Sequence, residues 1–401
     1  MLPDEAALLR AVCDDPDDDT PRLVYADWLD ENPGAPGGTP DGRRARAAFI
    51  RLEVELVRHA QTYGDPRWAE IVPQTESLIR AHWPEWVAPL KAVPRVKWPG
   101  QLAWPGGYDR GFVDMVEFPT ARAFAEQAAR AYSLTPAGYL YFSRLTPRTA
   151  GALRLPHMRT VHTLNLGQGV RQHPGSYQHR PQEIGPAGAQ ALAANPTLTR
   201  LHTLSLAGCR IGDAGAEALA AAADAGRFPR LNERPTYLAE LDLSANGLTA
   251  VGLAAVLRSR LVAGVGRLRL ACNPLGGAGA AVLAAVPLPE TLWELDLNDT
   301  DLTDAGVQTL AAAPLSERLE VLCLIYNGLT DGAVETLTGG ARPRLKSLYL
   351  GYNRITPRGA ERLAGWCQGR SNAHVDLRGN VLGANERAGL RPLFGDAHVD
   401  F

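Results

Sequence analysis

Large apolar residues recur along most of the chain at fixed positions of a repeated unit, which also contains an asparagine near its end. The unit reads L-x-x-L-x-L-x-x-N-x-L and is complete over residues 238–248. Five successive copies begin at residues 238, 265, 292, 319 and 345, so their starts lie 27, 27, 27 and 26 residues apart. With two copies upstream and one downstream, eight registers span residues 161–390. A period of this size predicts an array of repeated structural units.

Each copy changes its hydrophobic period halfway along. Leu322 and Leu324 alternate with their neighbours, which is the pattern of a short strand with one buried face. The second half of the preceding copy instead places Val307, Leu310 and Ala311 at i, i+3 and i+4, which is the pattern of a helix with one apolar side. Every copy is therefore predicted to be a strand, a turn and a helix, whose apolar side only a neighbouring copy can cover.

The turn and the helix start carry residues suited to those places. Asn327 follows the strand, where its amide can bond neighbouring backbone. Thr303 and Asp304 are predicted N-caps of the next helix. Parallel strands lie about 4.8 Å apart whereas packed helices need roughly 8–10 Å, so the array must curve with its sheet inside. The first copies of the unit are spaced more widely than the others, which indicates two insertions, at 168–182 and 224–237. We interpret both as surface loops rather than binding loops.

This pattern resembles the leucine-rich repeat family, and its second half, as in Leu302-Thr-Asp-Ala-Gly-Val-Gln-Thr-Leu310, resembles the ribonuclease-inhibitor-like subclass. The resemblance implies an α/β horseshoe solenoid with a parallel concave sheet and convex helices. It also implies the common property of the family, which is binding to other proteins. About eight repeats with a C-terminal cap are expected over residues 158–401.

Residues 1–90 lack the period and predict a small all-α module instead. Helices are expected over Asp4–Cys13, Pro21–Glu31 with Thr20 as N-cap, Arg43–Tyr63 and Trp68–His82. Their expected core is Tyr25, Trp28, Leu29, Phe49, Leu52 and Leu56, which we expect to fold without the repeats.

Two strings in this part resemble a known bacterial module. The segment Thr20-Pro-Arg-Leu-Val-Tyr-Ala-Asp-Trp-Leu-Asp-Glu31, followed by Arg46-Ala-Ala-Phe-Ile-Arg-Leu52, resembles the repeat-companion domain, although that family has an acid where this chain has Ala48. The resemblance implies no activity. Residues 91–157 are expected to form a linker and a strand–helix–strand cap for the solenoid, with the cap over residues 110–142.

Composition narrows the class of partner and the compartment. Lys and Arg number 41 against 43 Asp and Glu, a formal net charge of −2, so no broadly basic surface is offered to nucleic acid. No charge-free apolar run is long enough to span a membrane, and the N-terminus has no secretory pattern. Five cysteines without a CxxC pair favour reduced thiols. We therefore expect a cytoplasmic protein that binds neither nucleic acid nor membrane.

Three features of the sequence could carry chemistry, and each has a structural interpretation that we prefer. The acidic run Asp14–Asp19 is interpreted as a helix-capping turn paired with Arg43, Arg44 or Arg46 rather than a cation loop. The histidines between residues 157 and 202 lack the spacing of a helical metal motif. The Gly-rich run 276–279 is interpreted as helix packing rather than a nucleotide loop. No catalytic, cofactor or metal site is predicted, and the protein is not expected to be an enzyme.

The concave strand positions are the most informative for binding, because the core does not require them. Their side chains change character along the array. Three neighbouring strands form an acid–base–acid ladder, with Glu240 and Asp242 on the first, Arg267 and Arg269 on the second, and Glu294 and Asp296 on the third. The next repeats become apolar and tyrosine-rich. The predicted protein-binding residues are Ile325, Tyr326, Tyr349 and Tyr352, with Asp376 and Arg378 as a polar rim. In the alternative, the C-terminal segment from Arg391 to Phe401 folds back over the tyrosines.

The function predicted from these patterns is a non-enzymatic scaffold for a protein partner bound on the concave face and adjacent loops. An alternative from another class is a GTPase activator or other enzyme regulator that uses an edge of the repeats, since one eukaryotic activator shares this repeat subclass. A third is a structural spacer without a saturable partner.

Overall fold

The computed structural model describes residues 2–59, 65–98, 108–142, 144–167, 182–229, 240–313, 319–339, 344–370 and 372–401. Most of each predicted insertion lies outside these ranges, namely residues 168–181 of the first and residues 230–237 of the second. The N-terminal unit consists of Met1–Leu145 with Leu155–Leu164, and the solenoid unit of Thr146–Arg154 with Asn165–Phe401. None of the helices in the described ranges has the length and apolar character that crossing a bilayer requires.

The described part of the N-terminal unit up to Lys91 contains the four predicted helices and one further short helix. They are α1 (Pro3–Asp14), α2 (Thr20–Glu31), α3 (Pro40–His59), α4 (Pro66–Trp86) and α5 (Ala88–Lys91). One detail of the prediction was wrong: Thr20 is the first residue of α2 rather than its cap, and the N-cap position belongs to Asp19. Pro21 lies in the first turn, where a missing N–H costs no intrahelical hydrogen bond.

The core of this unit differs in part from the predicted one. Three of the predicted side chains are buried, namely Tyr25, Leu29 and Phe49. Leu52 and Leu56 are only half-buried, because α3 turns the face of Ile50 and Val54 into the core instead. The predicted stripe was therefore about one position out of phase with the helix face that packs.

Residues beyond position 90 complete the same core. The Phe112 ring, 2 % exposed, lies 5.9 Å from the Tyr25 ring, and the Tyr108 ring lies 5.1 Å from that of Phe49. Both belong to a two-stranded antiparallel pair, β1 (Tyr108–Asp109) and β2 (Phe112–Val113). The helices alone would leave apolar surface exposed, so any independent folding of residues 1–90, which stays a prediction, would have to proceed without these rings.

The predicted strand–helix–strand element follows directly. It consists of β3 (Met115–Phe118), α6 (Ala121–Tyr132) and β4 (Tyr139–Phe142), and β3 pairs with β4 in parallel. Thr120 caps α6 by accepting a hydrogen bond from the Ala123 N–H. Its apolar centre is a cluster of three rings, Phe118, Phe124 and Phe142, whose centroids lie 5.0–6.3 Å apart.

The acidic run Asp14–Asp19 has other partners than predicted. Asp14 pairs with Arg159, and Asp19 pairs with Arg58 and Arg110. The loop's carbonyl oxygens are also used, because Pro16 O accepts hydrogen bonds from Arg22 and Arg110. The predicted pairing with Arg43, Arg44 or Arg46 was wrong. Arginines from elsewhere in the unit therefore bind the carboxylates of Asp14 and Asp19 and the carbonyl oxygens of this loop.

The solenoid unit contains the predicted array of strands. They are β6 (Thr203–Ser205), β7 (Glu240–Asp242), β8 (Arg267–Arg269), β9 (Glu294–Asp296), β10 (Val321–Cys323), β11 (Ser347–Tyr349), β12 (His374–Asp376) and β13 (His398–Asp400), with β5 (Thr163–Asn165) at the boundary of the two units. From β6 to β13 each strand pairs in parallel with the next one along the chain. The central residues face each other in register and are buried: Leu204, Leu241, Leu268, Leu295, Leu322, Leu348, Val375 and Val399.

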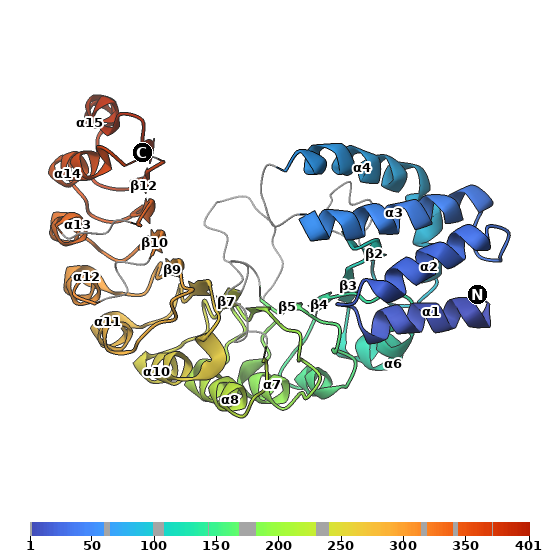
Figure 1. Cartoon of the computed structure of the whole chain (residues 1–401). Coiled ribbons are helices and arrows are strands. Elements are labelled where there is room, and N and C mark those ends of the chain that lie inside the picture. The colour runs from blue at the N-terminus through green and yellow to red at the C-terminus, as the bar shows by residue number, and fades with distance from the viewer. Residues whose placement is uncertain are drawn as a thin grey trace. The chain divides into compact units, whose positions relative to one another are not determined.

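The helices of this unit lie on the outer side of the curve and the strands on the inner side (Figure 1). They are α7 (Gly185–Ala193), α8 (Gly212–Asp224), α10 (Ala250–Arg258), α11 (Gly276–Ala285), α12 (Thr303–Ala311), α13 (Asp331–Thr338), α14 (Pro357–Cys367) and α15 (Ala384–Leu390), with 3-10 turns η2 (Ala150–Arg154), η3 (Arg260–Val262) and η5 (Arg391–Phe394). The Gly-rich run opens α11, and a Cβ on Gly279 would lie 2.5 Å from the Leu275 Cβ. The missing side chain allows close packing, in agreement with the packing interpretation.

Several helix starts are hydrogen-bonded to the helix start of the neighbouring repeat. Asp304 does not cap α12 as predicted: its Oδ1 accepts from the N–H of Thr330, at the start of the next helix, at 2.8 Å. Asp213 and Asp331 accept from Thr249 and Thr356 in the same way, both at 2.9 Å. These aspartates therefore connect neighbouring repeats along the outer side.

An asparagine ladder connects neighbouring repeats where the strands end. The Nδ2 of Asn353 donates to Leu324 O in the preceding repeat and to Leu350 O in its own, both at 2.9 Å. Its Oδ1 accepts from the N–H groups of Asn327 and Leu329, at 2.9 and 3.1 Å. Asn246, Asn273, Asn327 and Asn380 make hydrogen bonds of the same kind. Each amide thus pairs buried backbone groups of two repeats, as predicted for Asn327.

Truncation of the leucine column in mid-array tests the register. Leu295 is fully buried between Leu268 and Leu322, so Leu295→Ala removes apolar contacts and leaves a cavity that neighbouring repeats cannot fill. We expect the free energy of unfolding, measured by urea denaturation of the full chain, to fall by about 2–5 kcal/mol. Leu393→Ala, at an exposed leucine of the same unit, is the control and should change it little. A loss below about 1 kcal/mol for Leu295→Ala would refute the register.

Candidate functional site

The predicted binding residues lie in two places rather than on one row of strands. Tyr349 is the last residue of β11 and is half-buried on the inner side of the sheet. Tyr326 and Tyr352 lie in the turns that follow β10 and β11, where they are 54 % and 45 % exposed. Their placement on strands was therefore wrong, although their exposure agrees with the prediction.

Two of the predicted residues do not lie on the surface. Ile325 is 6 % exposed, because the alternation of buried and exposed positions stops where β10 ends and the chain turns inward. Asp376 is 1 % exposed and lies beneath Arg378, which donates to it from Nε at 2.9 Å and from Nη2 at 2.8 Å. Of the predicted polar rim, only the partly exposed Arg378 can meet a partner, and Asp376 fixes its orientation.

The two turn tyrosines form a stacked pair. Their ring centroids lie 4.5 Å apart with an angle of 16° between the ring planes. A Cβ on Gly379, in the corresponding turn of the next repeat, would lie 2.5 Å from Tyr352 Cδ1. The Tyr352 ring therefore lies over that glycine, with the Tyr326 ring stacked on it. Stacked aromatic pairs of this geometry contribute about 0.5–1.5 kcal/mol beyond the area that they bury.

The backbone at these positions does not favour tyrosine. Both residues directly precede a ladder asparagine, and their φ angles are +58° and +54°. The same place in other repeats also has positive φ and holds Gly208, Ala245, Cys272, Asp299 and Gly379. A left-handed conformation costs a residue with a Cβ roughly 1–2 kcal/mol. Two exposed tyrosines at positions where glycine would be easier therefore have no evident role in folding.

A second aromatic row runs along the last three strands. His374 lies next to Tyr349 in an edge-to-face arrangement at 5.0 Å, and His398 lies 4.7 Å beyond it. Sequence reasoning missed both histidines. The strand register could have indicated that these two histidines are neighbours. His374 is the register partner of Ser347 on one side and of His398 on the other. Burial raises the pKa of Tyr349 above its usual value, and nearby anionic side chains add to the rise.

In this part of the sheet, the structure places three residues whose nitrogen and oxygen atoms lie close enough together to hold a metal ion. Donor atoms of His374, His398 and Asp400 lie within 4.8 Å of one another, and two imidazoles with a carboxylate suit zinc. In the structure His374 Nε2 instead lies 3.0 Å from Asp400 Oδ2. Burial alone would raise the pKa of Asp400, but that contact and the nearby cations lower it overall. The histidine–carboxylate contact engages two of the three residues, His374 and Asp400.

The C-terminal segment does not cover the turn tyrosines. Its end forms β13, which extends the sheet beside β12, and the Phe394 and Phe401 rings pack edge to face at 5.8 Å. Tyr326 and Tyr352 stay exposed, so this alternative was wrong for these two rings.

The arginines of the acid–base ladder pair laterally with glutamates of both neighbouring strands, as predicted. Arg269 lies 3.4 Å from both Glu240 and Glu294, and Arg267 lies 3.8 and 3.5 Å from the same two carboxylates. Asp296, in the same strand as Glu294, is 7 % exposed and accepts from the Asn298 N–H at 3.0 Å. Burial raises the pKa of Asp296 to about 6, against the opposing effects of that hydrogen bond and of Arg269.

The comparisons with known proteins concern the repeats. The family model described as Leucine Rich repeat matches residues 194–220, 234–257, 290–311 and 343–364. A solved leucine-rich repeat protein of Leptospira interrogans is similar with 18 % identity and a TM-score of 0.23, covering 67 % of this chain and 79 % of that one. No curated protein matches the sequence. The matched segments, with the parallel strands and outer helices, show an α/β leucine-rich-repeat solenoid preceded by a helical region.

The raised pKa of Asp296 predicts a dependence of stability on pH. Because the folded state holds this proton up to about pH 6 while an unfolded aspartate releases it near pH 4, the free energy of unfolding should fall as pH rises between these values. Asp296→Asn keeps an oxygen for the Asn298 N–H and removes the titration. Its stability relative to the wild type should be higher at pH 7.5 than at pH 4.5, by about 1–3 kcal/mol in urea denaturation.

The matched control for this test is Asp299→Asn, at an exposed aspartate in the following turn. It should show the same difference from the wild type at both pH values. An equal difference at both pH values for Asp296→Asn would contradict the assignment.

Proposed function

We propose that this leucine-rich repeat protein is a non-enzymatic scaffold that binds a protein partner through the C-terminal half of its solenoid. We call the surface formed by Tyr326, Tyr349, Tyr352, His374 and Arg378 the tyrosine surface. The observation that carries the proposal is the exposed Tyr326–Tyr352 stack, held in turns whose backbone favours glycine. Large exposed side chains kept at positions with a conformational cost are candidates for a role in binding.

The chemistry of this surface suits a protein partner. Tyrosine buries a large area, offers a hydroxyl and loses little side-chain entropy, and tyrosine and arginine are enriched where interfaces gain most of their binding energy. Stacking on the neighbouring ring limits the motion of Tyr326 and Tyr352, and the two hydrogen bonds that Arg378 donates to Asp376 limit the motion of Arg378. Side chains ordered before binding lose less entropy on association.

Finer assignments are part of the same proposal. The 27-residue period and an α-helix in each described repeat support the ribonuclease-inhibitor-like subclass. The arrangement of α1–α4 supports a repeat-companion module over residues 1–90, followed by a linker and cap to residue 157. Free cysteines, four of the five buried, support a reducing, cytoplasmic location.

The experiment begins by identifying the partner at the proposed surface. A photo-crosslinking amino acid at Tyr326 of the full chain, used in the native cell, should capture a protein that the same label at Tyr139 does not. Tyr139 is a suitable control because it belongs to the N-terminal unit and stacks on Tyr141 at 6.2 Å. Accelerated hydrolysis by a captured GTPase would favour the enzyme-regulating alternative.

Affinity for the captured partner then tests the residues. Tyr326→Ser with Tyr349→Ser should weaken binding by about thirtyfold or more, because two large contact surfaces are lost. The thermal unfolding midpoint should fall only modestly, because Tyr326 is 54 % exposed and Tyr349 is only half-buried. The control Tyr139→Ser should bind like the wild type. Unchanged affinity for the double variant, or no saturable partner, would overturn the proposal.

A further inference from the structure

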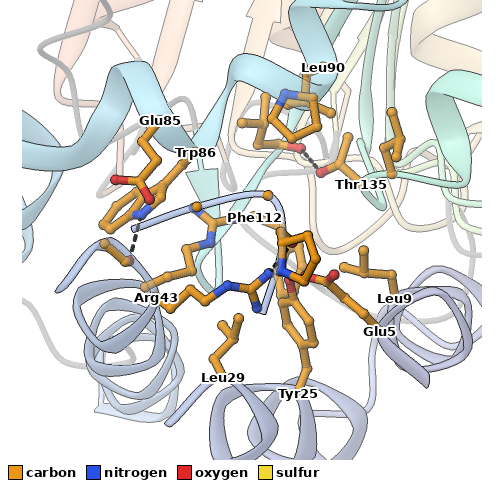
Figure 2. A pocket seen from close by; sticks show the side chains of 18 residues that line it. Glu5, Leu9, Tyr25, Leu29, Arg43, Glu85, Trp86, Leu90, Phe112 and Thr135 are labelled. Carbon is orange, nitrogen blue, oxygen red and sulfur yellow. Dashed lines mark hydrogen bonds and ion pairs between the residues drawn. The ribbon is translucent and has the colours of Figure 1, made fainter. Parts of the chain in front are cut away.

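A cavity of about 220 Å³ lies inside the N-terminal unit. Helices α1 to α5, the loop before α3 and strand β2 contribute to its lining. Figure 2 shows Leu9, Tyr25, Leu29, Leu90 and Phe112 as much of its wall, with Glu5 and Arg43 meeting among them. The wall is therefore mostly apolar and aromatic, with a few polar groups at one place.

Arg46 lines this cavity from α3 without a counter-ion among the described residues. Its guanidinium carbon lies 5.0 Å from the Trp86 ring centroid, 5.3 Å from that of Phe112 and 5.8 Å from that of Phe49. Its Nη1 is buried and meets no hydrogen-bond acceptor in the described part of the chain. Burial lowers the pKa of Arg46, which reflects the cost of a charge enclosed by rings.

Arg43, one turn earlier on α3, also leaves a nitrogen unused. It is 5 % exposed, and its other nitrogens are bonded: Nε to Ala35 O at 3.1 Å, and Nη2 to Pro36 O at 2.7 Å and to Glu5 Oε1 at 3.3 Å. Its Nη1 is buried and has no acceptor among the described residues. Two guanidinium groups that line one cavity thus each have a buried N–H group to offer.

The nearby carboxylates do not neutralise Arg46. Glu5 is engaged by Arg43 and by the Tyr25 hydroxyl, and Glu85 accepts from the N–H and the hydroxyl of Thr39. Burial raises the pKa of Glu53 to about 7, and the charge of Asp109 adds to the rise although Arg46 opposes it. Glu53 is therefore only partly ionised at neutral pH, and the positive charge of Arg46 is not fully compensated.

We propose that this cavity binds a small organic monocarboxylate, whose carboxylate group accepts hydrogen bonds from Arg43 and Arg46 and whose apolar body contacts the aromatic wall. A guanidinium matches a carboxylate in shape and charge. One negative charge is enough to balance the incompletely compensated charge of Arg46, whereas a phosphate brings more charge than the cavity can balance. The volume lies below the roughly 300–1,000 Å³ of pockets for drug-sized ligands, so the ligand is smaller than those.

The experiment titrates the full chain with benzoate by calorimetry at constant ionic strength. Benzamide, which has the same shape without the charge, and inorganic phosphate are titrated in parallel. We expect saturable binding of benzoate at one site per chain and no saturable binding of benzamide or phosphate. This comparison needs no variant. Binding of benzamide as tight as that of benzoate, saturable binding of phosphate alone, or no binding of benzoate would overturn the proposal.

Variants then locate the site. Arg46→Met keeps the length of the side chain and removes the charge, and we expect it to weaken benzoate binding by about tenfold or more. Arg44→Met, at an exposed arginine on the same helix, is the matched control and should bind benzoate like the wild type. Thermal unfolding without ligand should show that Arg46→Met folds, since an enclosed unpaired charge contributes little to stability. Equal benzoate affinity for Arg46→Met and the wild type would place the site elsewhere and overturn the assignment.

Discussion

The solenoid depends on hydrogen bonds that each ladder asparagine makes to the repeat before it. A strand of three residues cannot bury its own apolar side, so every repeat needs its neighbour at a fixed spacing. Leucines stacked in register provide the apolar contact, but they do not pair the backbone groups exposed where each strand ends. The asparagine amides pair those groups across repeats. The same geometry forces the preceding residue into positive φ, and this places Tyr326 and Tyr352 outward in their turns.

Much of the solenoid could be predicted from the sequence because its contacts repeat at a constant spacing. The leucine register, the strand–helix alternation and the role of Asn327 all follow from that period. The burial of Ile325 and Asp376 could not be predicted correctly. The alternation of buried and exposed side chains holds only within a strand, and these strands are three residues long. The histidine row was missed because its members adjoin only across strands, although the register contained the necessary signal.

The N-terminal unit was harder to predict because its contacts connect distant parts of the chain. Tyr25 packs on Phe112, and Asp14 pairs with Arg159, at separations that no local pattern indicates. Arginines illustrate the same limit. Arg269 on the sheet is balanced by Glu240 and Glu294, whereas Arg46 is enclosed by rings without a described counter-ion. The sequence shows only an arginine in both cases. Whether that arginine is paired with carboxylates or enclosed by rings depends on its surroundings in the folded chain.

The ladder's coupling of neighbouring repeats can be measured directly with a double-mutant cycle on Asn327 and Asn353. The Asn327 N–H donates to Asn353 Oδ1 at 2.9 Å, and the two side-chain amides bond adjacent carbonyl oxygens of the same repeat, Ile325 O and Leu324 O. Free energies of unfolding are compared for the wild type, Asn327→Ala, Asn353→Ala and the double variant. If the ladder couples the repeats, the effects should be non-additive by about 1 kcal/mol or more. Additivity within about 0.3–0.5 kcal/mol would contradict the coupling.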